Sequence, residues 1–403
     1  MKRREFLRNT TFTTAGSLLV PQFLKAYETQ YSAPSTLNEK VVVIIQLSGG
    51  NDGLNTVVPF RNDIYYRERP SIAIKSTNVL RLNDDIGLNP ALEKIKELYD
   101  NGLVSIINNV GYPNPDRSHF RSMDIWQTGS SASEYLSTGW IGRYLDAQCA
   151  GQSAKTAPHQ ALEIDDTLSL ALKGKNLNGL ALQNPEKLFS QTQNGFVKAN
   201  SKLTPADDHE NVAYLYKTLA ETVSSAEYVY NKAQIHKSNK LYPTTELGKS
   251  LKTIAELITS GVSTRVYYVS LSGFDTHIRQ NDQQDRLLRQ YAEAVGVFVE
   301  DLKSTNRLDD VMIMTFSEFG RRVKQNASNG TDHGTANNVF VIGGPHRTKP
   351  VLSEAPDLTD LDNGDLKYKI DFRQIYSTLL DDWLKADSRL VLGQAFEPVR
   401  LFG

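Results

Sequence analysis

The sequence has little cysteine, no excess of charge and no long hydrophobic run, and each absence excludes a class of protein. Cys149 is the single cysteine among 403 residues, so an internal disulfide is impossible. Lys and Arg total 45 against 46 Asp and Glu, and this balance lacks the basic field that attracts nucleic acid. No apolar run approaches the roughly 20 residues of a permanent membrane span. The composition, 39% hydrophobic and 23% charged, instead fits a globular protein of one large α/β domain or two to three smaller ones.

The N-terminus, MKRREFLRNTTFTTAGSLLVPQFLKAY, has the features of an export signal. Arg3 and Arg4 precede Phe6 and Leu7, and a mildly apolar stretch follows. This pattern resembles a twin-arginine signal; a basic amphipathic helix is the alternative. We expect a signal over residues 1–27, export of the folded chain to the periplasm or the cell exterior, and a mature domain over residues 38–403.

Five apolar runs rich in β-branched residues predict strands that are buried on both faces. They cover residues 41–47, 103–108, 265–271, 311–316 and 338–342. Amphipathic segments between these runs predict helices. Strands that alternate with helices indicate an α/β fold with a doubly wound, mostly parallel sheet. The strand pattern fades over residues 150–260, where we expect an inserted, mainly helical subdomain.

Candidate ligands lie close to the ends of the predicted strands. These residues are Asp52, Asp116, Ser118, His119, Asp275, His277, Glu318, Arg321 and His333. In open α/β sheets, ligands bind outside the carboxyl ends of the strands, so we expect these distant loops to meet.

The residue types in these loops predict a metal site. Carboxylates and imidazoles are the usual ligands of zinc, manganese and similar ions. Asp275 and His277, two apart in an extended loop, would present both side chains on one face. His333 would complete their ligand set, while Asp52 and Glu318 would hold a second ion.

The same loops also offer groups for catalysis at such a site. A serine at a helix N-terminus beside a metal is a plausible nucleophile. Either Ser118 or water activated by the metal would attack the substrate. Arg321 would pair with an anionic oxygen.

Each of these residues also has an ordinary structural interpretation. Asp52 and Ser118 are typical helix caps. Glu318 and Arg321 would form a weak surface ion pair. A metal site is favoured because two of the seven histidines lie in glycine-flanked loops beside acids.

Long stretches of the chain resemble the exported family known as domain of unknown function 1501. They are QLSGGNDGLNT, DRSHFRSMDIWQTG, GWIGRYLD, GFDTHIRQ and MTFSEFGRRVKQNASNGTDHGTANNVFVIGG. That family looks like a branch of the alkaline phosphatase and sulfatase superfamily. The resemblance implies an alkaline-phosphatase-like fold, metal ligands at Asp52, Asp275, His277 and His333, and the nucleophile position at Ser118.

The sequence departs from the superfamily pattern where the second ion would bind. Glu318 and Phe319 stand where an Asp-His pair is usual, so the second ion would lose an imidazole. The position after Ser118 lacks the proline that formylglycine sulfatases need. The resemblance therefore implies one intact metal set, made by Asp275, His277 and His333.

These features support competing functional hypotheses. The first is an exported hydrolase that uses one or two divalent ions, namely zinc, manganese or calcium, on a phosphate or sulfate ester of a small molecule or polysaccharide. The second, indicated by Glu318-Phe319, is a non-catalytic envelope binding or assembly protein on a degenerate scaffold. A purely structural α/β protein would bind no metal.

Overall fold

The computed structural model describes residues 40–149, 158–203, 210–344 and 352–401. The predicted signal over residues 1–27 lies outside the described residues, so the export route stays a prediction. None of the described helices combines the length and the apolar character that a membrane crossing requires.

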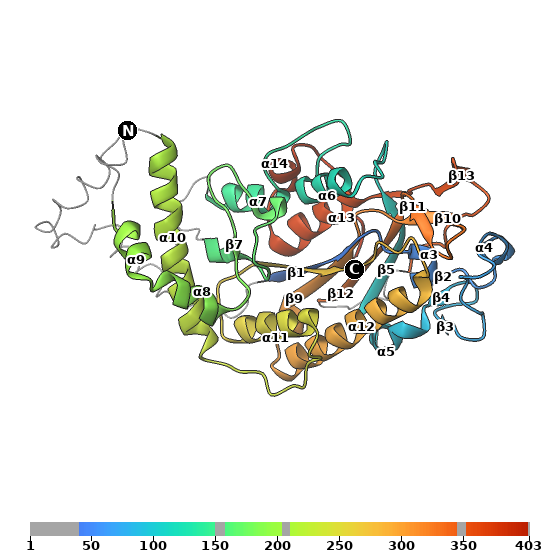
Figure 1. The fold of residues 1–403 in the computed structure, drawn as a ribbon, viewed down its shortest axis with the longest axis horizontal. Helices are drawn as coiled ribbons and strands as arrows, with labels where there is room; N and C mark the ends of the chain where they lie inside the picture. The colour runs from blue at the N-terminus through green and yellow to red at the C-terminus, as the bar shows by residue number, and fades with distance from the viewer. Residues whose placement is uncertain (1–39, 150–157, 204–209, 345–351, 402–403) are drawn as a thin grey trace, which may run out of the picture. The chain divides into compact units, whose positions relative to one another are not determined.

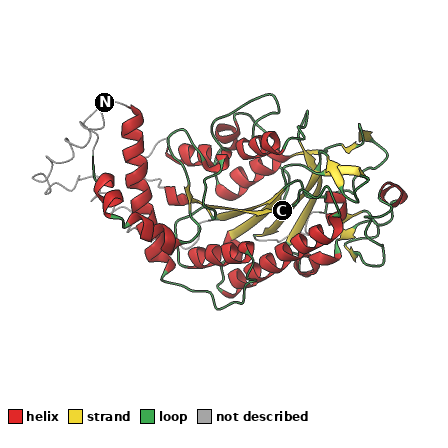
Figure 2. Ribbon diagram, viewed as in Figure 1, coloured by secondary structure: helices red, strands yellow, loops and turns green. Residues whose placement is uncertain are grey.

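An eight-stranded mixed sheet forms the centre of the described domain (Figures 1 and 2). In spatial order its strands are β15 (Ile370–Asp371), β5 (Val104–Gly111), β12 (Asn337–Gly343), β9 (Val311–Phe316), β1 (Val41–Ser48), β8 (Val266–Ser272), β6 (Ala161–Glu163) and β7 (Leu180–Ala181). β12 runs antiparallel to both of its neighbours, and every other pair in the sheet is parallel. The predicted α/β fold with a mostly parallel sheet is confirmed.

The continuous apolar strands are buried because helices cover both faces of the sheet. In β1, Val43 and Ile45 belong to one core, while Val42 and Ile44 belong to the other, as the alternation of side chains along a strand requires. The first core packs against α5 (Glu93–Asp100), α11 (Glu246–Thr259) and α12 (Gln280–Ser304). The second packs against α6 (His119–Thr128), α7 (Trp140–Cys149), α13 (Phe372–Thr378) and α14 (Ser388–Leu392) (Figure 1).

The middle of the chain combines helices with two strands that the sequence pattern did not reveal. The α-helices are α8 (Pro185–Thr192), α9 (Gly195–Ser201), α10 (Glu210–Ala233) and α11, which also packs on the central sheet. The short strands β6 and β7 extend the central sheet beside β8. Runs of three and two residues carry too little periodicity to be read from sequence. The boundaries of a helical insertion over residues 150–260 stay a prediction.

Short elements surround the carboxyl ends of the central strands. α3 (Gly53–Thr56) directly follows the β1 loop, and α4 (Asp63–Glu68) and the small sheet β2 (Val57–Val58), β4 (Gly87–Leu88) and β3 (Leu80–Arg81) come next. Two further pairs, β10 (Arg321–Gln325) with β11 (Thr331–His333) and β13 (Leu361–Asp362) with β14 (Asp365–Leu366), follow β9 and β12. The register of the first pair places Arg321 opposite His333.

Candidate metal centre

Side chains from three separate segments converge around Asp275, which follows β8. Its Oδ1 lies 3.0 Å from His277 Nε2 and 3.2 Å from His333 Nε2, and these two nitrogens are 3.0 Å apart. Its Oδ2 lies 3.5 Å from Nε2 of His119, the first residue of α6. The structure thus brings together the predicted set of Asp275, His277 and His333 and adds His119.

Three of these residues form a compact group of possible ligands. One ligand atom from each of His119, Asp275 and His333 lies within 4.8 Å of the others. In a tetrahedral zinc site with Zn–N distances of about 2.0–2.1 Å, neighbouring ligand atoms are roughly 3.3 Å apart. The separations around Asp275 bracket that value, so the spacing fits a single ion.

The hydrogen-bond partners of the imidazole rings determine which ring nitrogens carry the proton and which present a lone pair to the cluster. Nδ1 of His333 lies 2.7 Å from the carbonyl oxygen of Arg117, which can only accept, so this nitrogen carries the proton. Nδ1 of His119 lies 3.0 Å from the carboxylate of Glu318 in the same way. In the neutral rings, both Nε2 atoms are therefore acceptors. Such a partner on the second ring nitrogen is the usual way that proteins orient a metal-binding histidine.

The nitrogen and oxygen lone pairs of the cluster are better matched to a bound cation than to one another. Nε2 of His119 is buried and has no hydrogen-bond partner among the described residues. Lone pairs of His119 and His333 face the carboxylate oxygens of Asp275, where neither side supplies a donor. Buried acceptors that face one another are costly unless a proton or a metal lies between them. The chemistry of these residues thus matches a divalent metal.

The charge states of Asp275 and His333 agree with a ligand role. Partial burial alone would raise the pKa of Asp275, but the hydrogen bond and positive charge of the Arg321 guanidinium hold that pKa at about 2. Burial lowers the pKa of His333. The hydrogen bond to Glu318 raises the pKa of His119 above its usual range. At neutral pH the cluster thus contains an ionised carboxylate and a neutral His333.

Glycines after β1 let the backbone pass directly beneath the cluster. Gly49 has φ +119°, and a Cβ there would lie 2.5 Å from the amide nitrogen of Asp275. Gly50 has φ +73°, and its Cβ would collide with the ring of Phe319. The amide of Gly49 donates to Glu318 Oε1 at 2.8 Å. The SGG sequence is therefore required by close packing of three loops.

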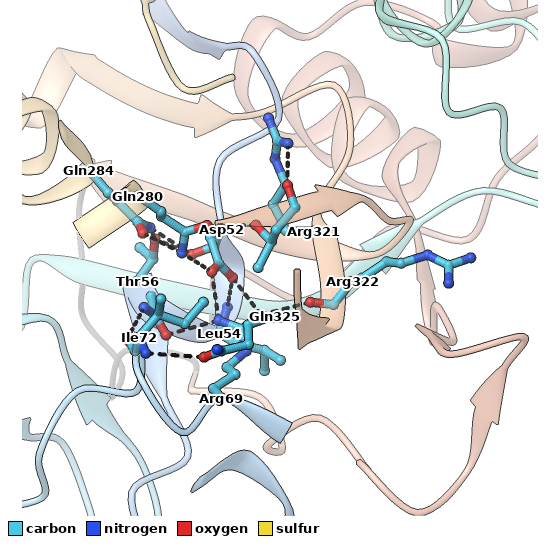
Figure 3. Close-up of polar contacts among 12 residues, drawn as sticks. Asp52, Leu54, Thr56, Arg69, Ile72, Gln280, Gln284, Arg321, Arg322 and Gln325 are labelled. Carbon is cyan, nitrogen blue, oxygen red and sulfur yellow. Dashed lines mark hydrogen bonds and ion pairs between the residues drawn. The ribbon is translucent and has the colours of Figure 1, made fainter. Parts of the chain in front are cut away.

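Asp52 lies in a separate buried network (Figure 3). Arg69 donates to both of its carboxylate oxygens, at 2.6 and 3.0 Å, and both side chains are fully buried. The amides of Gln280 and Leu54 also donate to this carboxylate, which caps α3. Because four donors surround it and it lies outside the cluster, the structure argues against the predicted metal role and supports the capping alternative.

Arg321 is also placed differently from the prediction. Its side chain is fully buried, and its guanidinium donates to carbonyl oxygens of Gly49, Gly50, Phe274 and Thr331 as well as to Asp275 at 2.7 Å. These contacts use its donors within the protein. Arg321 therefore ties three loops together beneath the cluster and is not available to a substrate anion, which corrects the predicted catalytic role.

Glu318 and Ser118 flank the cluster. Glu318 is buried and accepts from Gly49 and His119, which makes it the partner of a ligand, and it is not among the three grouped ligands. Ser118 is exposed and occupies the N-cap of α6, but its side chain makes no capping hydrogen bond. The Ser118 hydroxyl is thus not used for helix capping, the ordinary structural role considered for it.

Sequence reasoning noted His119 among the candidates at the start of a helix but left it out of the metal set. It lies in DRSHF, where Ser118 drew attention as the nucleophile position. The available signal was its place at the start of a helix that follows a buried strand, the same context that singled out the other loops.

Phe319 occupies the side of the cluster where a second imidazole was expected. Its ring centroid lies 4.9 Å from that of His119 and 4.7 Å from that of His333. An apolar ring there holds two ligand rings in place but offers no donor to a second ion.

Comparison with solved structures gave distant likenesses. A PsFucS1 sulfatase from Pseudoalteromonas sp. is 12% identical, with 93% of this chain and 72% of that chain covered and a TM-score of 0.37. The C-terminal periplasmic domain of EcEptC from Escherichia coli, in complex with Zn, is 10% identical, with 77% and 74% covered and a TM-score of 0.34. A TAB5 alkaline phosphatase mutant with Mg bound is 10% identical, with 78% and 94% covered and a TM-score of 0.33. At these values the likeness carries no argument about activity.

Comparison with curated proteins gave no match. The family model described as "Protein of unknown function (DUF1501)" matches residues 39–394. This range includes every residue of the cluster. The chain therefore belongs to the DUF1501 family, as the sequence motifs predicted.

Proposed function

We propose that this protein is an exported hydrolase of phosphate or sulfate esters that works with one divalent metal held by His119, Asp275, His277 and His333. The observation that carries the proposal is the convergence of three Nε2 atoms on one ionised carboxylate. Export rests on the twin-arginine pattern, and the ester class rests on the family resemblance.

The chain's own residues would prepare this site in defined ways. Glu318 and the carbonyl of Arg117 fix the rings of His119 and His333, so their Nε2 lone pairs face inward. Arg321 holds Asp275 ionised and in place. A divalent metal bound there would supply Lewis-acid polarisation of the ester group.

Ser118 is the proposed nucleophile. Its exposed hydroxyl lies at the N-terminus of α6, where the helix dipole stabilises developing negative charge. Its position next to His119 in the chain places its backbone beside the cluster.

A second candidate function is binding without catalysis. Asp52 is neutralised by Arg69 and Phe319 replaces an imidazole, so the described residues supply no second metal set. A protein that kept one ion to bind an anionic ester would have this arrangement.

The experiment is ester hydrolysis by protein purified without chelator, with zinc, manganese or calcium added. The substrates are p-nitrophenyl phosphate and p-nitrophenyl sulfate. We expect turnover that Ser118→Ala reduces by about 100-fold or more, in the range of removing a catalytic group. The matched control, Ser304→Ala, alters an exposed serine at the end of α12 and should leave turnover unchanged.

Two results would change this assignment. Turnover that survives Ser118→Ala would remove the nucleophile role and favour attack by water. No turnover of any ester by folded, metal-loaded protein would favour the binding function.

A further inference from the structure

Two half-exposed arginines share one buried carboxylate near the cluster. Arg117 pairs with Oδ2 of Asp365, and Nε of Arg322 lies 3.6 Å from Oδ1 of the same residue. The Asp365 side chain is fully buried, whereas the side chains of Arg117 and Arg322 are 42% and 37% exposed. The carboxylate thus accepts a hydrogen bond from Arg117 and forms a longer ion pair with Arg322, and both guanidinium groups remain open to solvent.

Backbone contacts tie both arginines to the metal ligands. The carbonyl of Arg117 accepts from His333 Nδ1 at 2.7 Å. Arg322 follows Arg321, the register partner of His333 in the hairpin of β10 and β11. Both arginines therefore belong to segments that hold His333 in place.

Strand alternation separates the roles of Arg321 and Arg322. Successive side chains on a strand point to opposite faces. Arg321 is buried under the loops, so Arg322 points the other way, and Figure 3 shows its side chain extending away from the Asp52 network. The guanidinium that remains available for a ligand is therefore that of Arg322.

Arg117 and Arg322 keep unused hydrogen-bond donors and positive charge. Counted by themselves, Arg117, Arg322 and Asp365 carry a net charge of +1 (2 − 1). Each guanidinium has five N–H donors, and its only side-chain contact within the described part of the chain is with Asp365. Two further acids lie on the same segments: Asp116 accepts from the amide of Ser118 at 2.7 Å, and Asp362, the register partner of Asp365, accepts from Asn363 at 2.9 Å.

The N-terminus of α6 lies directly after Arg117. No side chain caps it, because Ser118 makes no capping bond. Uncapped helix N-termini present N–H groups that favour anions. Here that feature accompanies an arginine pair anchored by a buried acid, and the two observations point to the same kind of ligand.

We infer that Arg117 and Arg322 form an oxyanion-binding site on the two segments that hold His333. Its ligand is a phosphate or sulfate group, held by charge-assisted hydrogen bonds from both guanidinium groups. This inference rests on the proposed function for identifying that group as part of the substrate. The site performs the task that the sequence had suggested for Arg321.

The test is isothermal titration calorimetry with inorganic phosphate, on chelator-treated protein at low ionic strength where charge interactions are least screened. We expect Arg117→Gln and Arg322→Gln each to weaken phosphate binding about tenfold, and the double variant about 100-fold, since both guanidinium groups contact the anion. Arg67→Gln, which removes an exposed arginine paired with Glu68 on α4, is the matched control and should bind like wild type.

Lysine variants keep the test decisive if removal of both charges unfolds the protein. Arg117→Lys with Arg322→Lys preserves the charges around Asp365 but removes the guanidinium fork. We expect weaker phosphate binding in this variant at an unchanged melting temperature. Wild-type affinity in a folded double variant of either kind would overturn the inference.

The same variants separate this inference from the proposed hydrolase. Arginine-dependent phosphate binding without any ester turnover would keep the site and remove the enzyme. Ester turnover with KM and phosphate affinity unaltered in the double variant would keep the enzyme and remove the site.

Discussion

Two acid–arginine pairs lie beyond the carboxyl ends of the strands, and they differ in what surrounds the acid. Asp52 and Arg69 are both fully buried, and every contact of the Asp52 carboxylate is a donor. Asp275 pairs with the equally buried Arg321, but its side chain is 48% exposed and its remaining neighbours are imidazole nitrogens. The first carboxylate is satisfied by the protein, and the second also faces the lone pairs of His119 and His333. The remaining partners of each acid, more than the acid or its arginine, distinguish a structural ion pair from a metal ligand.

The largest effect that we expect is a loss of stability when the Asp52–Arg69 pair is broken. Arg69→Met leaves a buried carboxylate without its partner, which typically costs about 3–5 kcal/mol. Urea denaturation should show this fall in the free energy of unfolding, while the metal content of the folded fraction stays unchanged. Loss of metal at unaltered stability would instead place Asp52 in the metal site.

Glu163 shows how far burial raises the pKa of an acid that has no arginine partner. Burial raises the pKa of Glu163, on β6, to about 7 even though the amide of Ser169 donates to it at 2.6 Å. Between pH 4.5 and about 7 the folded protein keeps a proton that the unfolded chain releases, so the free energy of unfolding falls as pH rises through this window. The fall should total about 3 kcal/mol.

Comparing the wild type with Glu163→Gln isolates the contribution of Glu163 to the pH dependence of the free energy of unfolding. His159, buried with its pKa lowered to about 3, contributes an opposite slope at acidic pH in both proteins. The difference between the two denaturation curves should therefore change with pH by the Glu163 term alone. Parallel curves from pH 4.5 to 8 would contradict the raised pKa.

A smaller effect, on metal affinity, is expected at Glu318, which contacts His119. Glu318→Gln keeps an acceptor near His119 but removes the charge that orients the ring. Loss of such a partner typically weakens metal binding 10- to 100-fold. Competition with a chromophoric chelator would measure this, with Glu300→Gln on the exposed face of α12 as the control. Unchanged affinity would remove the orienting role, and complete loss of binding would make Glu318 a direct ligand.

The sequence was sufficient to predict the central strands and the meeting of their loops. A buried parallel strand must be apolar on both faces, so runs such as residues 41–47 stand out from the polar loops that follow. Strands as short as β6 carry no such pattern. The convergence of Asp275, His277 and His333 was predictable because parallel strands end at one edge.

The roles of individual charges were not predictable, because they depend on contacts between distant segments. Arg69 follows Asp52 by 17 positions on an irregular segment after α4, and no local pattern links the two. The alternation that buries Arg321 and exposes Arg322 becomes visible only once β10 is known to be a strand. His119 joins the cluster only because α6 begins beside Asp275.

Metal binding at the cluster is the central claim, and the most direct measurement is metal content by mass spectrometry. Wild-type protein purified without chelator should be compared with His333→Ala and with Asp52→Asn. The account predicts close to one divalent ion per chain in the wild type and in folded Asp52→Asn, and loss of that ion in His333→Ala. A wild-type protein that takes up no zinc, manganese or calcium, or a His333→Ala variant that retains the ion, would contradict it.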